Sequence, residues 1–297
     1  MSKKLQISII IIGYNTSSDL LKLLGSIKVA RGSENILEII YIDDGSSDSS
    51  FEQFKSFSLA IHKRGKKLDK NRGRAYATNA GISMARGDWC LFVRSNEIFS
   101  SNLLLEYKKT MAKKKMLAYM GSVKYSSVDK KLVNYLNDSR RGVGLFKEGA
   151  LIHYKFLLFN NSIVQTSVCK QIGLNVALRH YGGEEIDFSY KLNRLYPEKI
   201  CACPRAFVYR DNYPSLHNHC KRLEEFGNTN LKLLPNNLQR LIVGSALLLR
   251  GSTRLSFCIS MIYRGVAFIN NCLPCTIYFF IRFQFLLAVL KGYYKTS

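Results

Sequence analysis

The sequence predicts an α/β protein with a mixed, mostly parallel sheet flanked by helices. Residues 7–12, 37–42 and 89–93 are apolar runs of strand length, the first two rich in β-branched residues, as expected of strands buried on both faces. Apolar residues recur at helical spacing over residues 20–27, and residues 74–86 form a second helical pattern. This alternation of strand and helix is typical of a doubly wound sheet.

The later elements are less regular. Residues 161–166 predict a strand, residues 185–196 a helix, and residues 215–233 a further helix with Ser215 as its N-cap. The basic runs at residues 63–70 and 113–115 are interpreted as solvated faces or loops.

The chain has 297 residues and a formal net charge of +23. So large an excess indicates a polyanionic partner, which could be nucleic acid, an anionic membrane or a phosphate-bearing substrate. The sequence has no nucleic-acid motif with interleaved aromatic residues, so nucleic acid is not expected. The eight cysteines form neither a disulfide framework nor a zinc motif, which favours a reducing cytoplasm.

Polar side chains follow each predicted strand of the first half. Tyr14 comes after the first, Asp43 and Asp44 after the second, and Arg94 after the third. Ligands of doubly wound sheets bind at the carboxyl ends of the strands, so we expect these residues to converge on one site. The alternative for Asp43 and Asp44 is an ordinary turn, since Asp and the following Gly45 are turn formers.

The composition changes near residue 235. Residues 238–297 contain no Asp or Glu, and seven basic residues punctuate an otherwise apolar segment. Its longest uncharged window, residues 265–281, is shorter than the roughly 20 apolar residues of a simple membrane span. The pattern favours helices lying in the interface of an anionic leaflet. A spanning hairpin and a buried soluble core are the alternatives.

Three segments form an ordered set of motifs. Residues 8–15 are followed by an Asp-Asp-Gly-Ser turn at residues 43–46, and residues 71–87 carry Asn-x-Gly, Asn-x-Gly-Ile and Ala-x-Gly. Residues 181–187 read Tyr-Gly-Gly-Glu-Glu-Ile-Asp. Together they resemble glycosyltransferase family 2, over about residues 5–235. The resemblance implies the Rossmann-like GT-A fold and an inverting enzyme that uses a nucleotide sugar. The predicted domains are therefore a GT-A domain, residues 5–235, and a helical, membrane-associated tail, residues 238–297.

The resemblance also implies roles for acidic residues. Glu185 matches the family's catalytic Asp and is one methylene longer; such a base takes the proton of the acceptor hydroxyl as it attacks the anomeric carbon. Glu184 and Asp187 are predicted to bind the acceptor, and capping of the helix is the second role open to Asp187. The alternative for all three is an acidic first turn that only complements the helix dipole.

On the donor side the resemblance implies UDP as the nucleotide. Tyr14 is predicted to stack on the base, and Asp44 to accept a hydrogen bond from the base or the ribose. Arg74 is predicted to face the diphosphate. The alternative is that Arg74 is only a solvated residue of the helix.

The family's Asp-x-Asp metal motif is degenerate in this sequence. Residues 94–97 read Arg-Ser-Asn-Glu, and Arg210 stands where many relatives have a His. Guanidinium groups can neutralise a leaving diphosphate as Mg²⁺ or Mn²⁺ does. We therefore predict that Arg94 and Arg210, with Arg74, replace the metal, so that no cofactor is needed. Two alternatives stay open: a weak Mg²⁺ or Mn²⁺ site that includes Asn96 and Glu97, and a non-catalytic partner or scaffold protein.

The sequence thus predicts a glycosyltransferase of cell-envelope polysaccharide or glycolipid synthesis. Its expected partners are a nucleotide sugar, a saccharide or lipid-linked acceptor, and an anionic membrane surface. The expected location is the cytoplasmic face of that membrane.

Overall fold

The computed structural model describes residues 5–244, 253–273 and 275–295, which divide into two compact units. The first unit holds the residues up to 124, residues 139–176 and residues 188–211. The second holds residues 125–138, residues 177–187 and the residues from 212 onward. Residues 212–234, assigned above to the first domain, thus group with the tail. Arg250 and Pro274 of the predicted tail lie outside the described residues.

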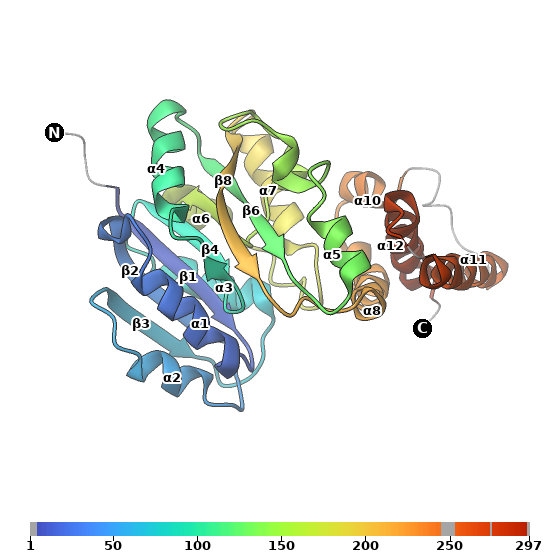
Figure 1. Ribbon diagram of the computed structural model, residues 1–297, viewed down its shortest axis with the longest axis horizontal. Helices are drawn as coiled ribbons and strands as arrows, with labels where there is room; N and C mark the ends of the chain where they lie inside the picture. The colour runs from blue at the N-terminus through green and yellow to red at the C-terminus, as the bar shows by residue number, and fades with distance from the viewer. Residues whose placement is uncertain (1–4, 245–252, 274, 296–297) are drawn as a thin grey trace. The chain divides into compact units, whose positions relative to one another are not determined.

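The first unit contains an eight-stranded mixed sheet (Figure 1) with the order β3-β2-β1-β4-β7-β6-β8-β5. Its central strands β2, β1 and β4 are parallel, and β3 adds to β2 in parallel, whereas β7 pairs antiparallel with β4 and β6, and β5 with β8. The strands predicted in the first half and at residues 161–166 are confirmed. The strands are β1 (Ile7–Gly13), β2 (Ile36–Asp43), β3 (His62–Lys67), β4 (Trp89–Arg94), β5 (Ile98–Phe99), β6 (Ala118–Tyr125), β7 (Ser162–Gln165) and β8 (Ile200–Arg210).

Helices cover both faces of this sheet. Helices α1, α2 and α4 pack on one face, and α3, α6 and the last turns of α7 pack on the other. These helices are α1 (Ser17–Lys28), α2 (Ser50–Ser56), α3 (Arg74–Met84), α4 (Leu103–Lys113), α6 (Thr166–Ile172) and α7 (Glu184–Leu195). Short 3₁₀ turns occupy Ser33–Asn35, Gly142–Leu145 and Tyr154–Phe156.

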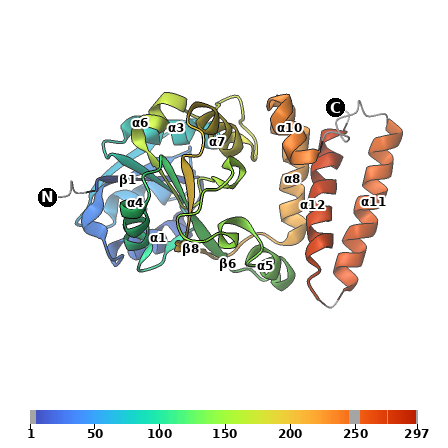
Figure 2. The same cartoon turned by 90° about the horizontal axis from the view of Figure 1, so that it is seen from above.

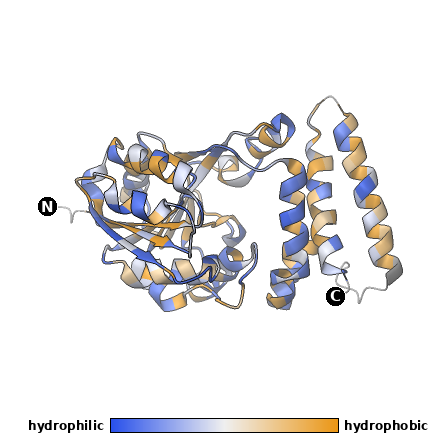
Figure 3. Ribbon diagram, turned by 90° about the horizontal axis from the view of Figure 1, so that it is seen from below, coloured by the Kyte–Doolittle hydropathy of each residue, from blue (hydrophilic) through white to orange (hydrophobic). Residues whose placement is uncertain are grey.

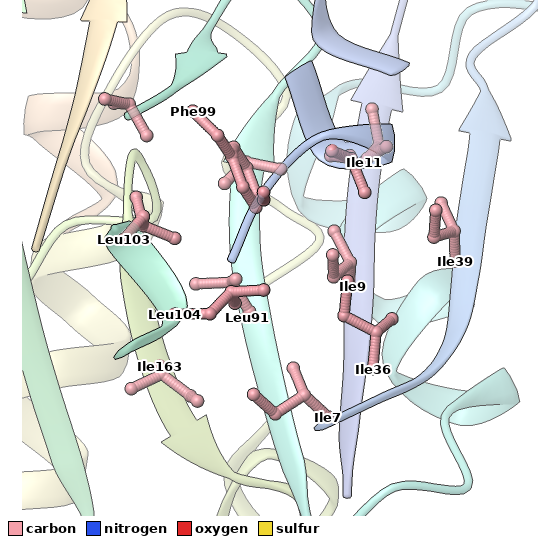
Figure 4. Packing of buried hydrophobic residues seen from close by; sticks show 14 of the residues in the cluster. Ile7, Ile9, Ile11, Ile36, Ile39, Leu91, Phe99, Leu103, Leu104 and Ile163 are labelled. Atoms are coloured by element: carbon pink, nitrogen blue, oxygen red, sulfur yellow. The ribbon is translucent and has the colours of Figure 1, made fainter. Parts of the chain in front are cut away.

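The core of the first face is drawn in Figure 4. Ile7, Ile9 and Ile11 of β1 point into it, whereas Ile10 packs on the opposite face. Successive side chains of a strand point to opposite faces, so the isoleucines of β1 supply both cores, with Ile10 and Ile12 on the second face. Burying each such side chain contributes about 1.5–3 kcal/mol.

One prediction about the elements is narrowed and another is corrected. Of the two interpretations of the basic run, solvated face or loop, residues 63–67 form a solvated face: they belong to β3, an edge strand whose mostly exposed, charged side chains discourage further strand pairing. The predicted helix over residues 215–233 is divided into α8 (Leu216–Asn228) and α9 (Asn230–Leu233). Its predicted cap is confirmed, because the Asn218 N–H donates to Ser215 Oγ at 3.4 Å.

The second unit is helical. Besides α8 and α9 it contains α5 (Lys130–Leu136), α10 (Asn236–Val243), α11 (Thr253–Cys272) and α12 (Tyr278–Tyr293). Figure 2 shows α8, α12 and α11 side by side. Lys131 of α5 donates from Nζ to the carbonyl of Asn270 at 2.7 Å, near the carboxyl end of α11, where a cation is favoured. The predicted tail is therefore helical. In the described part of the chain, no helix has both the length and the apolar character needed to cross a membrane.

Helices α8 and α12 meet at two glycines. A Cβ atom on Gly227 would lie 2.0 Å from the carbonyl oxygen of Val289, and one on Gly292 would lie 1.9 Å from that of Glu224. The two backbones therefore approach within a distance that no side chain allows. The Lys291–Glu224 ion pair, 2.7 Å long, spans the same interface.

Substitution of Gly227 by alanine is expected to destabilise the second unit by about 3 kcal/mol, because an overpacked methyl group would force the two helix backbones apart. Gly265 of α11 is the matched control, since nothing lies within 4 Å of its added Cβ. Gly265→Ala should raise stability by up to about 1 kcal/mol. Thermal unfolding followed by circular dichroism measures both. Equal melting temperatures for the two variants would contradict the close approach.

Candidate functional site

The loops after β1 and β2 are tied to each other. The Asn15 N–H donates to Ser46 Oγ at 2.8 Å, and Asn15 Oδ1 accepts the Ser47 N–H at 3.0 Å. The Ser17 N–H donates to a carboxylate oxygen of Asp48 at 3.0 Å. Burial raises the pKa of Asp48, but hydrogen bonds from Ser50 and Ser17 outweigh it and lower that pKa to about 2. Tyr14 belongs to the loop after β1 that these hydrogen bonds hold in place, and its side chain is half-exposed.

Asp44 holds the segment that leads into α3. Its two carboxylate oxygens accept the N–H groups of Arg72 at 2.8 Å and Gly73 at 3.0 Å. Burial raises the pKa of Asp44, and the two backbone hydrogen bonds only partly oppose this. Gly73 is the N-cap of α3 at φ 88°, and Arg74 is the first residue of the helix. The Asp44 carboxylate therefore sets the position of Arg74, in addition to any contact it makes with a nucleotide.

Residues 94–97, the segment predicted to replace the family's metal motif, form a closed turn after β4. The Arg94 N–H donates to Glu97 Oε2 at 2.8 Å, and the Glu97 N–H donates to the Arg94 carbonyl at 3.1 Å. Glu97 has 0% of its surface exposed. Its carboxylate is thus directed back at the turn that carries Arg94.

Strand pairing brings Arg210 to the same turn. Ile98 of β5 pairs with Tyr209 of β8, and Phe99 pairs with Val208. Continued by one residue, this antiparallel ladder sets Glu97 opposite Arg210, the last residue of β8. Arg210 has only 8% of its surface exposed. The register thus places Arg210 beside the turn at residues 94–97, which begins with Arg94.

These residues fit a divalent cation poorly. Mg²⁺ and Mn²⁺ take anionic or neutral oxygen ligands, whereas this turn carries Arg94 and lies opposite Arg210. One oxygen of Glu97 already accepts the backbone of the turn. Across the described residues, no three His, Cys, Asp or Glu side chains gather closely enough to hold a metal ion.

Asn160 is not among the site residues predicted from the sequence. It precedes β7, the antiparallel neighbour of β4, and so lies at the sheet edge where β4 ends. Its side chain is buried, and its Oδ1 atom has no hydrogen-bond partner among the described residues. The next residue, Asn161, is at φ 83° and donates from its amide to the carbonyls of Ser122 and Ala206, both at 2.8 Å. Asn160 therefore offers a fixed acceptor oxygen. The Asn-Asn pair before a strand was its only signal.

The acidic motif lies in the second unit. Gly182 and Gly183 are at φ 81° and 95°, a backbone region that favours glycine. They turn the chain into α7, whose first turn contains Glu184, Glu185 and Asp187. All three residues are buried, and all three stand at the helix N-terminus, where the dipole favours acidic groups.

Asn230 of α9 holds the loop before this helix. Its Nδ2 donates to the carbonyls of His180 at 2.8 Å and Gly182 at 2.6 Å, and its Oδ1 accepts the His180 N–H at 3.3 Å. Phe226 of α8 lies against the two glycines, 3.1 Å from where a Cβ of Gly183 would be. The entry to α7 is thus fixed by α8 and α9. Sequence reasoning did not identify Asn230.

The structure therefore groups the predicted residues in two sets. In the first unit Tyr14, Asp44, Arg74, Arg94 and Arg210 follow strands or begin a helix at one edge of the sheet. In the second unit Glu184, Glu185 and Asp187 form one buried turn.

Polar loops at the carboxyl ends of parallel strands are where α/β proteins of this kind bind their ligands. The chain belongs to glycosyl transferase family 2, whose model matches residues 8–213. Its curated relatives carry the name glycosyltransferase. Glycosyltransferase GlyG of Streptococcus pneumoniae serotype 4 is 34% identical over 99 residues, 33% of this chain and 32% of that protein. The uncharacterized glycosyltransferase YfnE of Bacillus subtilis is 29% identical over 114 residues, 38% of this chain and 29% of that protein. The match thus spans about a third of each of these relatives.

Solved structures share the fold. S. aureus TarS 1–349, in complex with UDP-GlcNAc, has a TM-score of 0.58 at 15% identity, over 97% of this chain and 90% of that chain. The mannosyltransferase PcManGT from Pyrobaculum calidifontis, in complex with GDP-Man and Mn²⁺, has a TM-score of 0.65 at 12% identity, over 98% and 86%. The fold likeness includes the C-terminal helices, since nearly the whole chain is covered.

Proposed function

We propose that this glycosyltransferase moves a sugar from a UDP-sugar to a hydroxyl group of a saccharide or lipid-linked saccharide, with inversion at the anomeric carbon. The acceptor oxygen forms the new bond to that carbon as the bond to the diphosphate breaks, and UDP leaves. Glu185 takes the hydroxyl proton. The nucleotide sugars bound to fold relatives, UDP-GlcNAc and GDP-Man, support a nucleotide-sugar donor.

The arginines neutralise the leaving group in this proposal. The observation that carries it is the register between β5 and β8, which sets Arg210 opposite the turn that begins with Arg94. Guanidinium groups bind phosphate oxygens in bidentate geometry, and buried charges act strongly on charge that develops during reaction. Arg74, at the N-terminus of α3, adds a third positive charge where a helix dipole also favours anions. Transfer would then proceed without a divalent cation.

The remaining side chains bind the two substrates. Tyr14 stacks on the base, Asp44 accepts a hydrogen bond from the nucleoside, and Glu184 and Asp187 hold hydroxyl groups of the acceptor. We place the reaction at the cytoplasmic face of a membrane, in the synthesis of cell-envelope polysaccharide or glycolipid. The support is the charge of +23 and the apolar, acid-free tail.

The test is turnover of UDP-, GDP- and dTDP-sugars by the purified chain, with EDTA and with added Mn²⁺, beside calorimetry of the free nucleotides. Turnover of a UDP-sugar that survives EDTA is the expected result. Activity only with Mn²⁺ would overturn metal independence and keep the transferase. Failure to bind any of the three nucleotides would overturn the proposal in favour of a non-catalytic partner protein.

A further inference from the structure

Helix α11 carries its larger apolar side chains on the outside. Phe257, Met261 and Phe268 are four and seven residues apart, so they lie on one side of the helix. Phe257 is 67% exposed and Phe268 is 70% exposed. Ile262 and Ile269 are exposed beside them. Apolar residues run along this helix in Figure 3.

The inner side of α11 is less apolar than the outer side. It buries Ile259 and Val266 but also Asn270, whose Nδ2 donates to Gln284 Oε1 of α12 at 2.6 Å. Tyr263, half-buried, lies on the same side. A helix that faces water shows the opposite arrangement, with its apolar stripe inward. Contiguous exposed apolar side chains of this kind mark an interaction surface.

The start of α12 also has exposed apolar side chains. Phe279 is exposed, and its ring stacks on that of Phe283 with the centroids 5.8 Å apart. We call six exposed apolar residues of the two helices the outer face: Phe257, Met261, Ile262, Phe268, Ile269 and Phe279.

The charges near the outer face have one sign. Arg264 is exposed on the same side of α11 as Phe257 and Phe268, and Arg282 is exposed one turn after Phe279. Residues 238–297 contain no Asp or Glu. A second copy of this chain seated face to face would set Arg264 against another acid-free surface, and like charges oppose such a contact. An anionic lipid surface complements both the arginines and the exposed rings.

We propose that the outer face lies in the headgroup region of an anionic bilayer, with α11 in the membrane plane. The proposal deepens the proposed function by naming the surface that meets the membrane, and it rests on that function only for the presence of a lipid-linked acceptor. Arg264 and Arg282 would contact lipid phosphates while the phenylalanine rings enter the acyl boundary.

The experiment is flotation of the full chain with vesicles of phosphatidylcholine alone and of equal parts phosphatidylcholine and phosphatidylglycerol. The wild-type chain should float with the mixed vesicles. Phe257→Gln/Phe268→Gln should lower the partition coefficient at least tenfold, since each buried ring is worth roughly tenfold or more in partitioning. Both rings are exposed, so the variant should melt at the wild-type temperature. Val29→Gln, at another exposed apolar residue, is the control and should float as the wild type does.

Three results would overturn the proposal. They are wild-type protein that floats with neither vesicle, a double variant that floats as well as the wild type, and a wild-type dimer in sedimentation that the double variant does not form. UDP-sugar hydrolysis without vesicles reports separately on the proposed function. A chain that hydrolyses the donor but does not float would refute the membrane surface alone. A chain that floats but binds no nucleotide would refute the transferase proposal alone.

Discussion

Replacement of Glu185 by glutamine is expected to lower the rate of sugar transfer about 10²- to 10⁴-fold and to leave UDP binding unchanged. The amide has the same size as the carboxylate but cannot take the acceptor proton. Glu185 lies in the first turn of α7 with 9% of its surface exposed, so the isosteric change should disturb the packing little. Steady-state kinetics with saturating donor measure the loss, and calorimetry measures UDP binding.

The matched control for this variant is Glu198→Gln, at an exposed residue after the same helix. It should transfer at the wild-type rate. Glu184→Gln separates binding from catalysis, because loss of an acceptor contact should raise the KM for the acceptor more than it lowers kcat. Transfer by Glu185→Gln within threefold of the wild type would contradict the role of this residue as the base.

The second large effect is expected at the arginines. Arg94→Gln and Arg210→Gln should each lower kcat about 10²- to 10³-fold, the cost of removing a positioned group that stabilises developing charge. The register sets both beside the turn at residues 94–97, so the double variant should lose less than the product of the single losses. Turnover in EDTA measures all three.

Arg86→Gln is the control for the arginine series. Arg86 is exposed and follows the C-terminal end of α3, whereas Arg74 begins this helix. Its replacement therefore changes the net charge by the same amount as Arg94→Gln but leaves the turn at residues 94–97 unchanged. It should keep wild-type turnover. Equal losses in Arg86→Gln and Arg94→Gln would show that the effect comes from overall charge, and full activity of Arg94→Gln in EDTA would refute the clamp.

The parallel half of the sheet could be predicted because its strands are apolar at nearly every position. Strand β3 could not, since its sequence His-Lys-Arg-Gly-Lys-Lys has neither an apolar run nor an alternation. It is a strand only because its backbone pairs with the edge of β2 that β1 does not occupy. Backbone pairing there overrides what the side chains indicate.

The candidate site was partly predictable for a related reason. Tyr14, Asp44 and Arg94 follow strands, and the rule for parallel sheets places such residues at one edge. That Arg210 lies opposite Glu97 depends on the register of two antiparallel strands about a hundred residues apart, which no local pattern records. The same holds for Asn230, which contacts His180, 50 residues away, and Gly182, 48 residues away.

Helix α8 links two features that lie far apart in the sequence. Phe226 packs against Gly182 and Gly183, which lead into Glu184, and the neighbouring Gly227 packs against the backbone of α12. Helix α12 therefore supports, through α8, the turn that contains Glu184. A chain shortened after α9 would expose the face of α8 that packs on α12. The turn that contains the carboxylates would then lose the support of α8, although every predicted catalytic residue would still be present.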